Sequence, residues 1–269
     1  MSSIPVGSAI GWSPEELMAV VLSREIRDWE VGSPGGARSE IPMAAVRLAQ
    51  ELHAPNLGII ASASGFAMNG IGKPASPLRS STTDYRNVYA GTEAVIPMGS
   101  IFRTRRDWFF AGGLQIDKRG NINMNRLGPD ILNPTMIGPG AAGLAYGAAH
   151  ARKYFIYVRN HDTRTFVEEV DYRSSVGFGD GVGYRARSGL TGAGPDLVVS
   201  PLAVLRFDDD RCLRLASVHP GHTVDEVVQA TGFDLGLGSG NVPTTKPPSA
   251  RELSTLRERV DVTGVLRGS

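Results

Sequence analysis

Two serines in a short run of small residues are the first side chains of this sequence that suggest chemistry. Ser62 and Ser64 stand in Ala-Ser-Ala-Ser-Gly at residues 61–65, where no carboxylate, imidazole or thiol accompanies their hydroxyls. The serine nucleophile of α/β-hydrolases lies in a Gly-x-Ser-x-Gly turn, and the first glycine of that turn is missing here. The run therefore predicts a loop that lines a ligand and donates hydrogen bonds to it without supplying a nucleophile.

Arg126 is the second chemical feature, and it stands in an asparagine- and glycine-rich stretch, residues 121–128. A planar guanidinium can bind a carboxylate through two parallel hydrogen bonds. The position therefore favours a carboxylate clamp, and a solvent-facing arginine fits the same sequence equally well.

A glycine run at residues 138–143, Gly-Pro-Gly-Ala-Ala-Gly, has the spacing GxGxxG. Backbone N–H groups of such a run, placed at the start of a helix, can hold a pyrophosphate or an oxyanion. A dinucleotide site would follow a strong apolar strand, whereas the preceding residues 133–137 form a short segment that contains a proline. The run favours an anion or oxyanion site. A glycine-rich turn that lets a helix pack closely fits the same spacing equally well.

Histidine and cysteine do not form a convincing metal site in this sequence. His219 and His222 have a spacing found at metal sites, but no nearby carboxylate or thiol completes a ligand set. We expect His219 to shape the turn before the following helix. Cys212 is the only cysteine, which excludes an internal disulfide and a cysteine-rich metal site. We therefore predict no metal.

The elements that must position these groups begin with a capped helix. Residues 13–16, Ser-Pro-Glu-Glu, form a capping box that opens a helix to about Arg27. A second amphipathic helix over 42–52 leads into an apolar strand that starts at Leu57 and ends in the run 61–65. Alternating strands and helices predict a parallel sheet, whose strand carboxyl ends are where ligands bind.

The rest of the chain continues this α/β pattern without an internal repeat or a change in composition. We predict strands over 107–114, 154–158 and 197–217, the last interrupted by a hairpin turn at 208–210. We predict turns over 117–123, and helices from 144 onward, over 223–232 and over 249–259, of which the last two are capped. The expected organisation is one domain over residues 1–269, in which 236–248 is a flexible linker to a C-terminal helix.

Composition narrows the partners and the compartment. The 28 basic and 27 acidic residues are interspersed, so neither a nucleic-acid footprint nor a polybasic membrane patch is indicated. The first residues lack the basic-then-apolar pattern of a signal peptide, and no uncharged apolar run is long enough to span a bilayer. We expect a soluble, cytoplasmic protein.

Five segments, taken in order, resemble the β subunits of family I CoA-transferases, particularly the glutaconate CoA-transferase type. They are EELMAVVLSREI at 15–26, GGLQIDKRGNINMNRLG at 112–128, GPGAAG at 138–143, RTFVEEVDYRSSVGF at 164–178 and VHPGHTVDEVVQATGFDL at 218–235. The resemblance implies an α/β fold of the NagB/RpiA/CoA-transferase type, with an open, mainly parallel sheet flanked by helices. It also implies an α subunit in an α2β2 heterotetramer, an active site at the subunit interface, and coenzyme A as part of the substrate with no separate cofactor.

Three departures from the transferase pattern point to a different reaction. Transferases of this family carry a nucleophilic glutamate in a Glu-Ser-Gly-like triplet, and the matching residues here are Ala63-Ser64-Gly65. Alanine cannot be acylated, so the glutamyl-CoA route should be closed to this chain. Arg126 replaces a small hydroxyl residue, and GPGAAG replaces a Gly-Ser-Gly-Gly-Ala-Asn-like run. This set resembles the β subunits of the actinobacterial steroid-ring-opening hydrolases of cholesterol catabolism, whose catalytic glutamate is expected on the α subunit.

The resemblance and the residues together define an expected site. We predict catalytic support from Arg126, Ser62 and Ser64, and substrate or CoA contacts from Ala63, Gly65, Asn123, Gly138, Gly140 and Ala141. The expected function is the β subunit of a CoA-ester hydrolase that opens the last steroid ring. A CoA-transferase β subunit acting on a dicarboxylic acyl-CoA and a non-catalytic scaffold for the α subunit are the alternatives.

Overall fold

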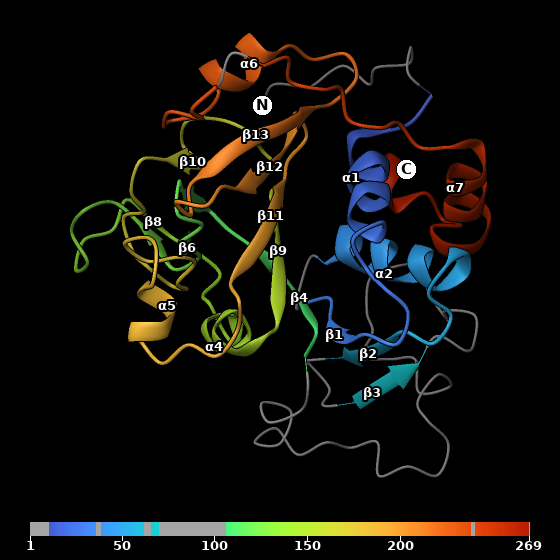
Figure 1. Cartoon of the computed structure of the whole chain (residues 1–269), viewed down its shortest axis with the longest axis horizontal. Helices are drawn as coiled ribbons and strands as arrows, with labels where there is room; N and C mark the ends of the chain where they lie inside the picture. Colours follow the sequence, from blue (N-terminus) through green and yellow to red (C-terminus); the bar gives the residue numbers. More distant parts are fainter. Residues whose placement is uncertain (1–10, 36–38, 62–65, 70–105, 238–239, 269) are drawn as a thin grey trace. The chain divides into compact units, whose positions relative to one another are not determined.

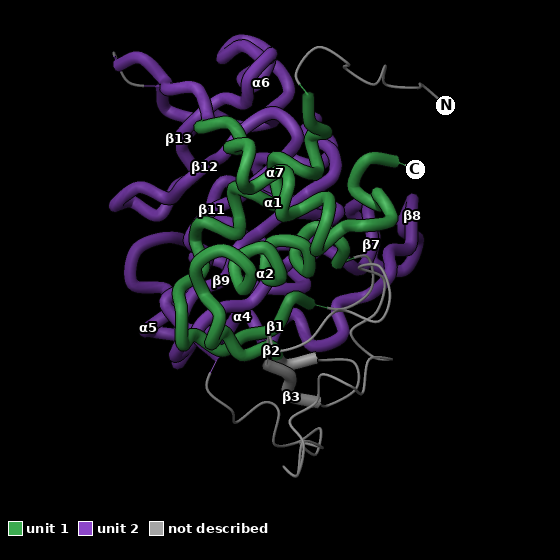
Figure 2. Tube along the Cα trace, turned by 90° about the vertical axis from the view of Figure 1, so that its right-hand side faces the viewer, with its two compact units in different colours: residues 1–97, 246–269 green, residues 98–245 purple. Residues whose placement is uncertain are grey.

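The computed structural model describes residues 11–35, 39–61, 66–69, 106–237 and 240–268. These residues belong to two compact units, unit 1 (residues 1–97 and 246–269) and unit 2 (residues 98–245) (Figure 2). The single domain expected over residues 1–269 stays a prediction.

Unit 1 begins with the predicted capped helix. In α1 (Pro14–Ser23), the Ser13 hydroxyl accepts from the Glu16 N–H at 3.1 Å and the Glu16 carboxylate accepts from the Ser13 N–H at 2.9 Å. The helix ends before the predicted Arg27, because the N–H groups of Glu25 and Ile26 donate three residues back and tighten the chain into turns. The capping box is therefore confirmed and the helix is shorter than expected.

Two further segments of unit 1 pack around α1. Helix α2 (Glu40–Leu52) confirms the second predicted helix, and it lies against α1. Helix α7 (Ala250–Thr255) has its own capping box from Ser249 and Glu252, and it continues as a π-helical turn (Leu256–Val260) and a 3-10 turn (Val265–Arg267). Figure 1 shows these C-terminal helices beside α1. The buried Glu16 carboxylate accepts from Arg257 Nε at 2.8 Å, which ties the two ends of the unit together.

The strands of unit 1 confirm the predicted apolar strand and give it a parallel partner that the sequence did not predict. Strand β1 (Val31–Ser33) pairs in parallel with β2 (Gly58–Ala61), and β2 pairs antiparallel with β3 (Phe66–Asn69). A Cβ on Gly58 would lie 2.9 Å from Val31 Cγ2, so the β1–β2 pairing needs a glycine there. Residues 62–65, which include Ser62, Ala63, Ser64 and Gly65, lie outside the described residues.

Unit 2 contains a mixed sheet with a parallel centre. Strands β4 (Trp108–Gly112), β9 (Lys153–Tyr157) and β11 (Pro195–Val199) are parallel, and β12 (Ala203–Phe207) and β13 (Leu213–Val218) extend the sheet in antiparallel fashion. Buried aromatic rings of β4 and β9 pack against each other in its core, and the ring centroids of Phe110 and Phe155 lie 5.3 Å apart. Helix α4 (Leu144–His150) packs on β4. The predicted α/β class with a mainly parallel sheet is confirmed (Figure 1).

Smaller elements of unit 2 carry the residues of chemical interest. Strand β5 (Gln115–Asp117) lies between β10 (Phe166–Val167) and β6 (Ile122–Asn123), and β7 (Arg126–Leu127) forms a hairpin with β8 (Met136–Ile137). Two short helices complete the unit, α5 (Tyr184–Arg187) and α6 (Val224–Gln229), and α6 has the predicted capping box. Among the described residues, none forms a helix long and apolar enough to cross a membrane.

The segment 236–248 is held to the sheet in its second half. Val218 of β13 donates its N–H to the Pro243 carbonyl at 3.0 Å, and Thr245 donates its N–H to the Val218 carbonyl at 2.7 Å. The flexible linker predicted over 236–248 stays a prediction, and within it backbone groups of Pro243 and Thr245 pair with the edge of β13.

Candidate functional site

Arg126 is held at the base of the β7–β8 hairpin by two contacts. Its Nη1 donates to the Ile131 carbonyl at 2.7 Å, and its guanidinium carbon lies 4.8 Å from the centroid of the Tyr172 ring. Within the described part of the chain, the guanidinium forms no ion pair with a carboxylate. The side chain is therefore oriented, and most of its N–H groups are still available to a ligand.

Asn123 shapes the loop that carries Arg126. It is fully buried, and its amide donates to Gln115 Oε1 at 2.8 Å and to the Arg126 carbonyl at 2.6 Å. Its Oδ1 accepts from the N–H groups of Asn125 and Arg126 at 3.0 and 3.3 Å. Both amide hydrogens and both lone pairs of Asn123 are engaged within the loop, so the side chain supports the backbone there. The predicted contact between Asn123 and substrate stays a prediction.

A second segment, residues 171–175, holds the same loop from the other side. The Asp171 carboxylate accepts from the Gly128 N–H at 2.8 Å, and the Ser174 hydroxyl accepts from the Met124 N–H at 2.9 Å. Tyr172 lies between these two anchors in sequence. Its contact with Arg126 was not predicted, because no spacing pattern links residues that are far apart in the chain.

The turn before this loop is fixed by a buried carboxylate. Asp117 Oδ1 accepts from the N–H groups of Arg119 and Asn121 at 2.9 and 3.0 Å, and Asn121 Nδ2 donates to Asp117 Oδ2 at 2.8 Å. Burial raises the pKa of Asp117, and the hydrogen bonds from Asn121 and Arg119 partly oppose that shift. The predicted turn is confirmed, and its hydrogen bonds fix the backbone that precedes the Arg126 loop.

The glycine run 138–143 is only partly available for anion binding. The N–H groups of Gly138 and Gly140 donate to the carbonyls of Asn125 and Met124 at 2.7 and 3.1 Å. These two N–H groups are therefore already paired with backbone carbonyls, and the substrate contact predicted for Gly138 and Gly140 stays a prediction. The N–H of Ala141 has no acceptor among the described residues, and the substrate contact predicted for Ala141 stays a prediction.

Packing explains why Gly138 is needed. A Cβ at this position would collide with the Met124 carbonyl oxygen and the Leu114 side chain. The run thus also serves as a turn that packs closely on the Arg126 loop, which is the alternative that the spacing alone left open.

His219 forms a buried hydrogen-bond network and has no metal-binding arrangement. Its Nε2 donates to the Ser200 carbonyl and its Nδ1 accepts from the Thr245 hydroxyl, both at 2.9 Å. Burial lowers the pKa of His219 to about 4, so the ring is neutral near pH 7. No group of three or more His, Cys, Asp or Glu in the described residues could hold a metal ion.

His161 lies in the same network, next to Ser200. Its Nδ1 lies 2.6 Å from the Ser200 hydroxyl and its Nε2 lies 3.0 Å from the Thr231 hydroxyl. Because the Thr231 hydroxyl donates to the Val227 carbonyl at 2.7 Å, it accepts from Nε2 of His161. Burial lowers the pKa of His161 to about 4, which makes it a second neutral, structural histidine.

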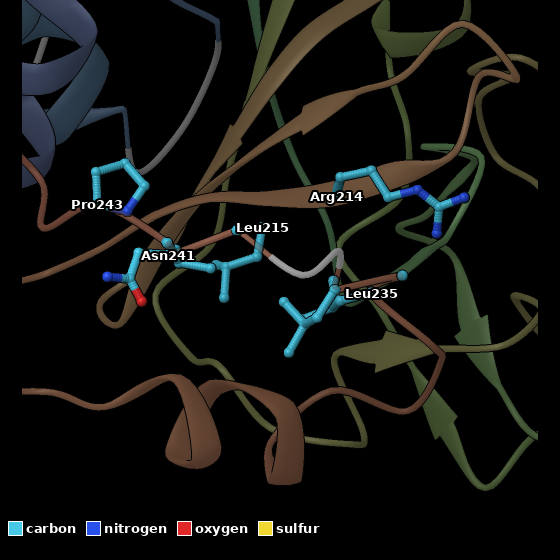
Figure 3. A pocket seen from close by; sticks show the side chains of 9 residues that line it. Arg214, Leu215, Leu235, Asn241 and Pro243 are labelled. Carbon is cyan, nitrogen blue, oxygen red and sulfur yellow. The ribbon is translucent and has the colours of Figure 1, made fainter.

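A separate pocket of about 190 Å³ lies beside β13 (Figure 3). Leu215, Leu235 and Asn241 contribute to its lining, and Arg214 at its edge is paired with Asp208 at 2.6 Å. Pockets for drug-sized ligands are larger, about 300–1,000 Å³. This pocket lacks a nucleophile or a general base and is too small for a CoA ester.

The fold and the segments that carry the Arg126 loop place the chain in a class of CoA-dependent enzymes. A model of the family described as Coenzyme A transferase matches residues 16–230. The chain belongs to the coenzyme A transferase family. The predicted family and fold are therefore confirmed.

Similar proteins define the type of subunit more closely. Glutaconate CoA-transferase from Acidaminococcus fermentans has a similar crystal structure, with a TM-score of 0.79 and 26% identity over 96% of this chain and 98% of that chain. The B-type subunit of 3-oxoadipate CoA-transferase from Pseudomonas knackmussii is 30% identical over 91% of this chain and 92% of its own length. The IpdB subunit of the cholesterol ring-cleaving hydrolase from Rhodococcus jostii is 32% identical over 64% of this chain and 68% of its own length. The chain is thus similar to B-type subunits of two-subunit enzymes, which supports a partner α subunit.

Proposed function

We propose that this chain is the β subunit of a heteromeric CoA-ester hydrolase that opens the last steroid ring by hydrolytic carbon–carbon cleavage in cholesterol catabolism. Ala63 carries the proposal, because the resemblance matches it to the position at which transferases of the family carry their nucleophilic glutamate. A methyl side chain cannot form the glutamyl-CoA thioester. Similarity to the ring-cleaving hydrolase subunit of Rhodococcus jostii supports the same reaction.

The proposed reaction adds one water across a carbon–carbon bond beside a ring carbonyl. The water oxygen bonds to the carbonyl carbon, which becomes a carboxyl group. The broken bond leaves its electron pair on the neighbouring carbon, which a second carbonyl attached to it holds as an enolate. The base then returns to this carbon the proton that it took from the water, and the other water hydrogen stays with the carboxyl group. Such a step needs a base for water and donors that stabilise the developing negative charge.

This chain contributes donors to the reaction, and the partner contributes the base. Arg126 is a cation of unit 2 that two contacts hold in place, and the Ala141 N–H is an amide of the glycine run without an acceptor within the described residues. Ser62 and Ser64 are proposed as further donors on sequence grounds. The partner α subunit, in an α2β2 heterotetramer, supplies the glutamate. Coenzyme A enters as part of the substrate without a separate cofactor, and the compartment is the cytoplasm.

Product analysis of the assembled complex tests this proposal. The chain is co-expressed with the product of the adjacent reading frame and incubated with steroid-ring CoA esters in isotopically labelled water. We expect a product that has gained one water, contains the label in a new carboxyl group and still carries coenzyme A. Release of coenzyme A to an added acid acceptor, with no ring-opened product, would contradict the hydrolase proposal.

A CoA-transferase acting on a dicarboxylic acyl-CoA is the second candidate. The longer span of similarity to the 3-oxoadipate CoA-transferase subunit favours it. Borohydride trapping during turnover separates the two candidates. Reduction of a glutamate in this chain, detected by peptide mass, would support transfer, and an unmodified chain together with water addition supports hydrolysis.

A further inference from the structure

The guanidinium of Arg126 has one engaged edge and one covered face. Nη1 donates to the Ile131 carbonyl at 2.7 Å, and the Tyr172 ring covers the guanidinium with its centroid 4.8 Å from the central carbon. A guanidinium has five N–H donors, and the Ile131 bond uses one of them. Within the described residues, the other four have no acceptor.

The backbone beneath Arg126 is also constrained. The buried Asn123 side chain binds both the N–H and the carbonyl of Arg126. Asp171 binds the Gly128 N–H, so the residue before Tyr172 is attached to the same loop that carries Arg126. The arginine and the tyrosine are therefore held in register by separate hydrogen bonds, and the cost of ordering the long side chain is already met before a ligand arrives.

Neighbouring carboxylates do not neutralise this cation. Asp171 is engaged with Gly128, and Asp130 accepts from the Leu132 N–H and from the Asn133 amide. Neither forms an ion pair with Arg126. A planar cation with two or more free parallel donors matches a carboxylate, which accepts two hydrogen bonds side by side.

We infer that Arg126 and Tyr172 form a carboxylate-binding site, in which Arg126 binds the carboxylate and Tyr172 is a positioning residue that orients the guanidinium. The inference rests on the proposed action on CoA esters. The carboxylate belongs either to the acyl group of the substrate or to a side chain of the partner subunit. Both sources present the same chemistry, and the measurement below separates them.

Equilibrium binding to the assembled complex tests the site without depending on turnover. Glutaryl-CoA and pentanoyl-CoA have acyl chains of the same length and differ in the terminal carboxylate. If the substrate supplies the carboxylate, the wild-type complex binds glutaryl-CoA about 10- to 100-fold more tightly, as expected for a charge-assisted bidentate contact. Arg126→Ala should abolish that preference, and Tyr172→Leu should reduce it about 3- to 10-fold.

Two variants serve as controls. Tyr172→Phe keeps the aromatic ring and should retain the preference for glutaryl-CoA, so a role of the ring is separated from a role of the hydroxyl. Arg187→Ala removes a charge from the surface helix α5, where Arg187 pairs with Asp180 at 2.9 Å, and it should leave the preference unchanged. A simple loss of folding in Tyr172→Leu would weaken binding of both esters equally.

The partner subunit as source of the carboxylate gives a different pattern. The wild-type complex would then bind both esters alike, and Arg126→Ala and Tyr172→Leu would raise the dissociation constant between the subunits, measured by sedimentation, while Tyr172→Phe would not. Unchanged ester preference and unchanged subunit affinity in Tyr172→Leu would overturn the inference. Neither result depends on whether the complex adds water to a carbon–carbon bond or transfers coenzyme A to another acid, so failure of the hydrolase proposal would be seen separately.

Discussion

The buried ring of His219 should make this protein lose stability as the pH falls from 7 to 5. The pKa of the ring is about 4 in the folded chain, because burial disfavours the charged form, and the ordinary value is 6.5. Between these two values the unfolded chain binds a proton that the folded chain does not, so the free energy of unfolding falls as the pH falls. The loss stops near pH 4, where both states are protonated.

The size of this effect follows from the two pKa values. One pKa unit corresponds to about 1.4 kcal/mol, so His219 should remove about 2 kcal/mol of stability between pH 7 and pH 5. The variant His219→Gln retains a side-chain N–H that can donate to the Ser200 carbonyl and cannot be protonated in this range. Its stability at pH 7 should be lower than that of the wild type, since the bond to Thr245 is lost.

Urea unfolding of the wild type and of His219→Gln at pH 7 and pH 5 isolates the contribution. We expect the wild type to lose about 2 kcal/mol more than the variant between the two pH values, because all other titrating groups are common to both proteins. Equal losses in the two proteins would refute the assignment of His219 as a buried, neutral ring. His161, with a pKa also lowered to about 4, should show the same pattern in His161→Gln.

Three substitutions test the other arrangements. Arg126→Ala should reduce turnover by about 100-fold or more, measured at protein concentrations at which the complex is assembled; an unchanged rate would remove Arg126 from the site. Gly138→Ala places a methyl group against the Met124 carbonyl and should lower the unfolding free energy by about 1–3 kcal/mol, measured by chemical denaturation; a stability equal to wild type would contradict this packing. Arg257→Ala leaves the buried Glu16 carboxylate without its closest partner and should lower the unfolding free energy by about 2–4 kcal/mol. A loss within about 0.5 kcal/mol, the ordinary effect of a surface substitution, would show that the pair contributes little.

Local patterns predicted the helix starts well. The capping boxes at Ser13, Thr223 and Ser249 are all present, since each needs only a hydroxyl and a glutamate three residues apart. The apolar runs likewise predicted β2, β4 and β9, because a strand that is buried on both faces is apolar at successive positions. Helix ends were less predictable, as α1 shows, because turns after Ser23 depend on backbone hydrogen bonds that no residue type marks.

The glycine run shows where spacing stops being informative. The pattern GxGxxG is the same whether its amides are free or paired. Only the folded chain places the carbonyls of Met124 and Asn125 against Gly140 and Gly138, and that pairing removes two of the predicted donors.

By itself, the sequence determined the class of protein, the capped helices, the apolar strands and the missing carboxylate at Ala63, because each depends on residue types or on spacings of a few positions. Tertiary structure alone decided which polar groups remain available. The hydrogen-bonding groups of the Asn123 side chain are all engaged within its own loop, whereas Arg126 packs against Tyr172 and keeps free donors among the described residues. The physical reason is that hydrogen-bond satisfaction is settled among groups brought together by folding, and their separation along the chain carries no signal of it.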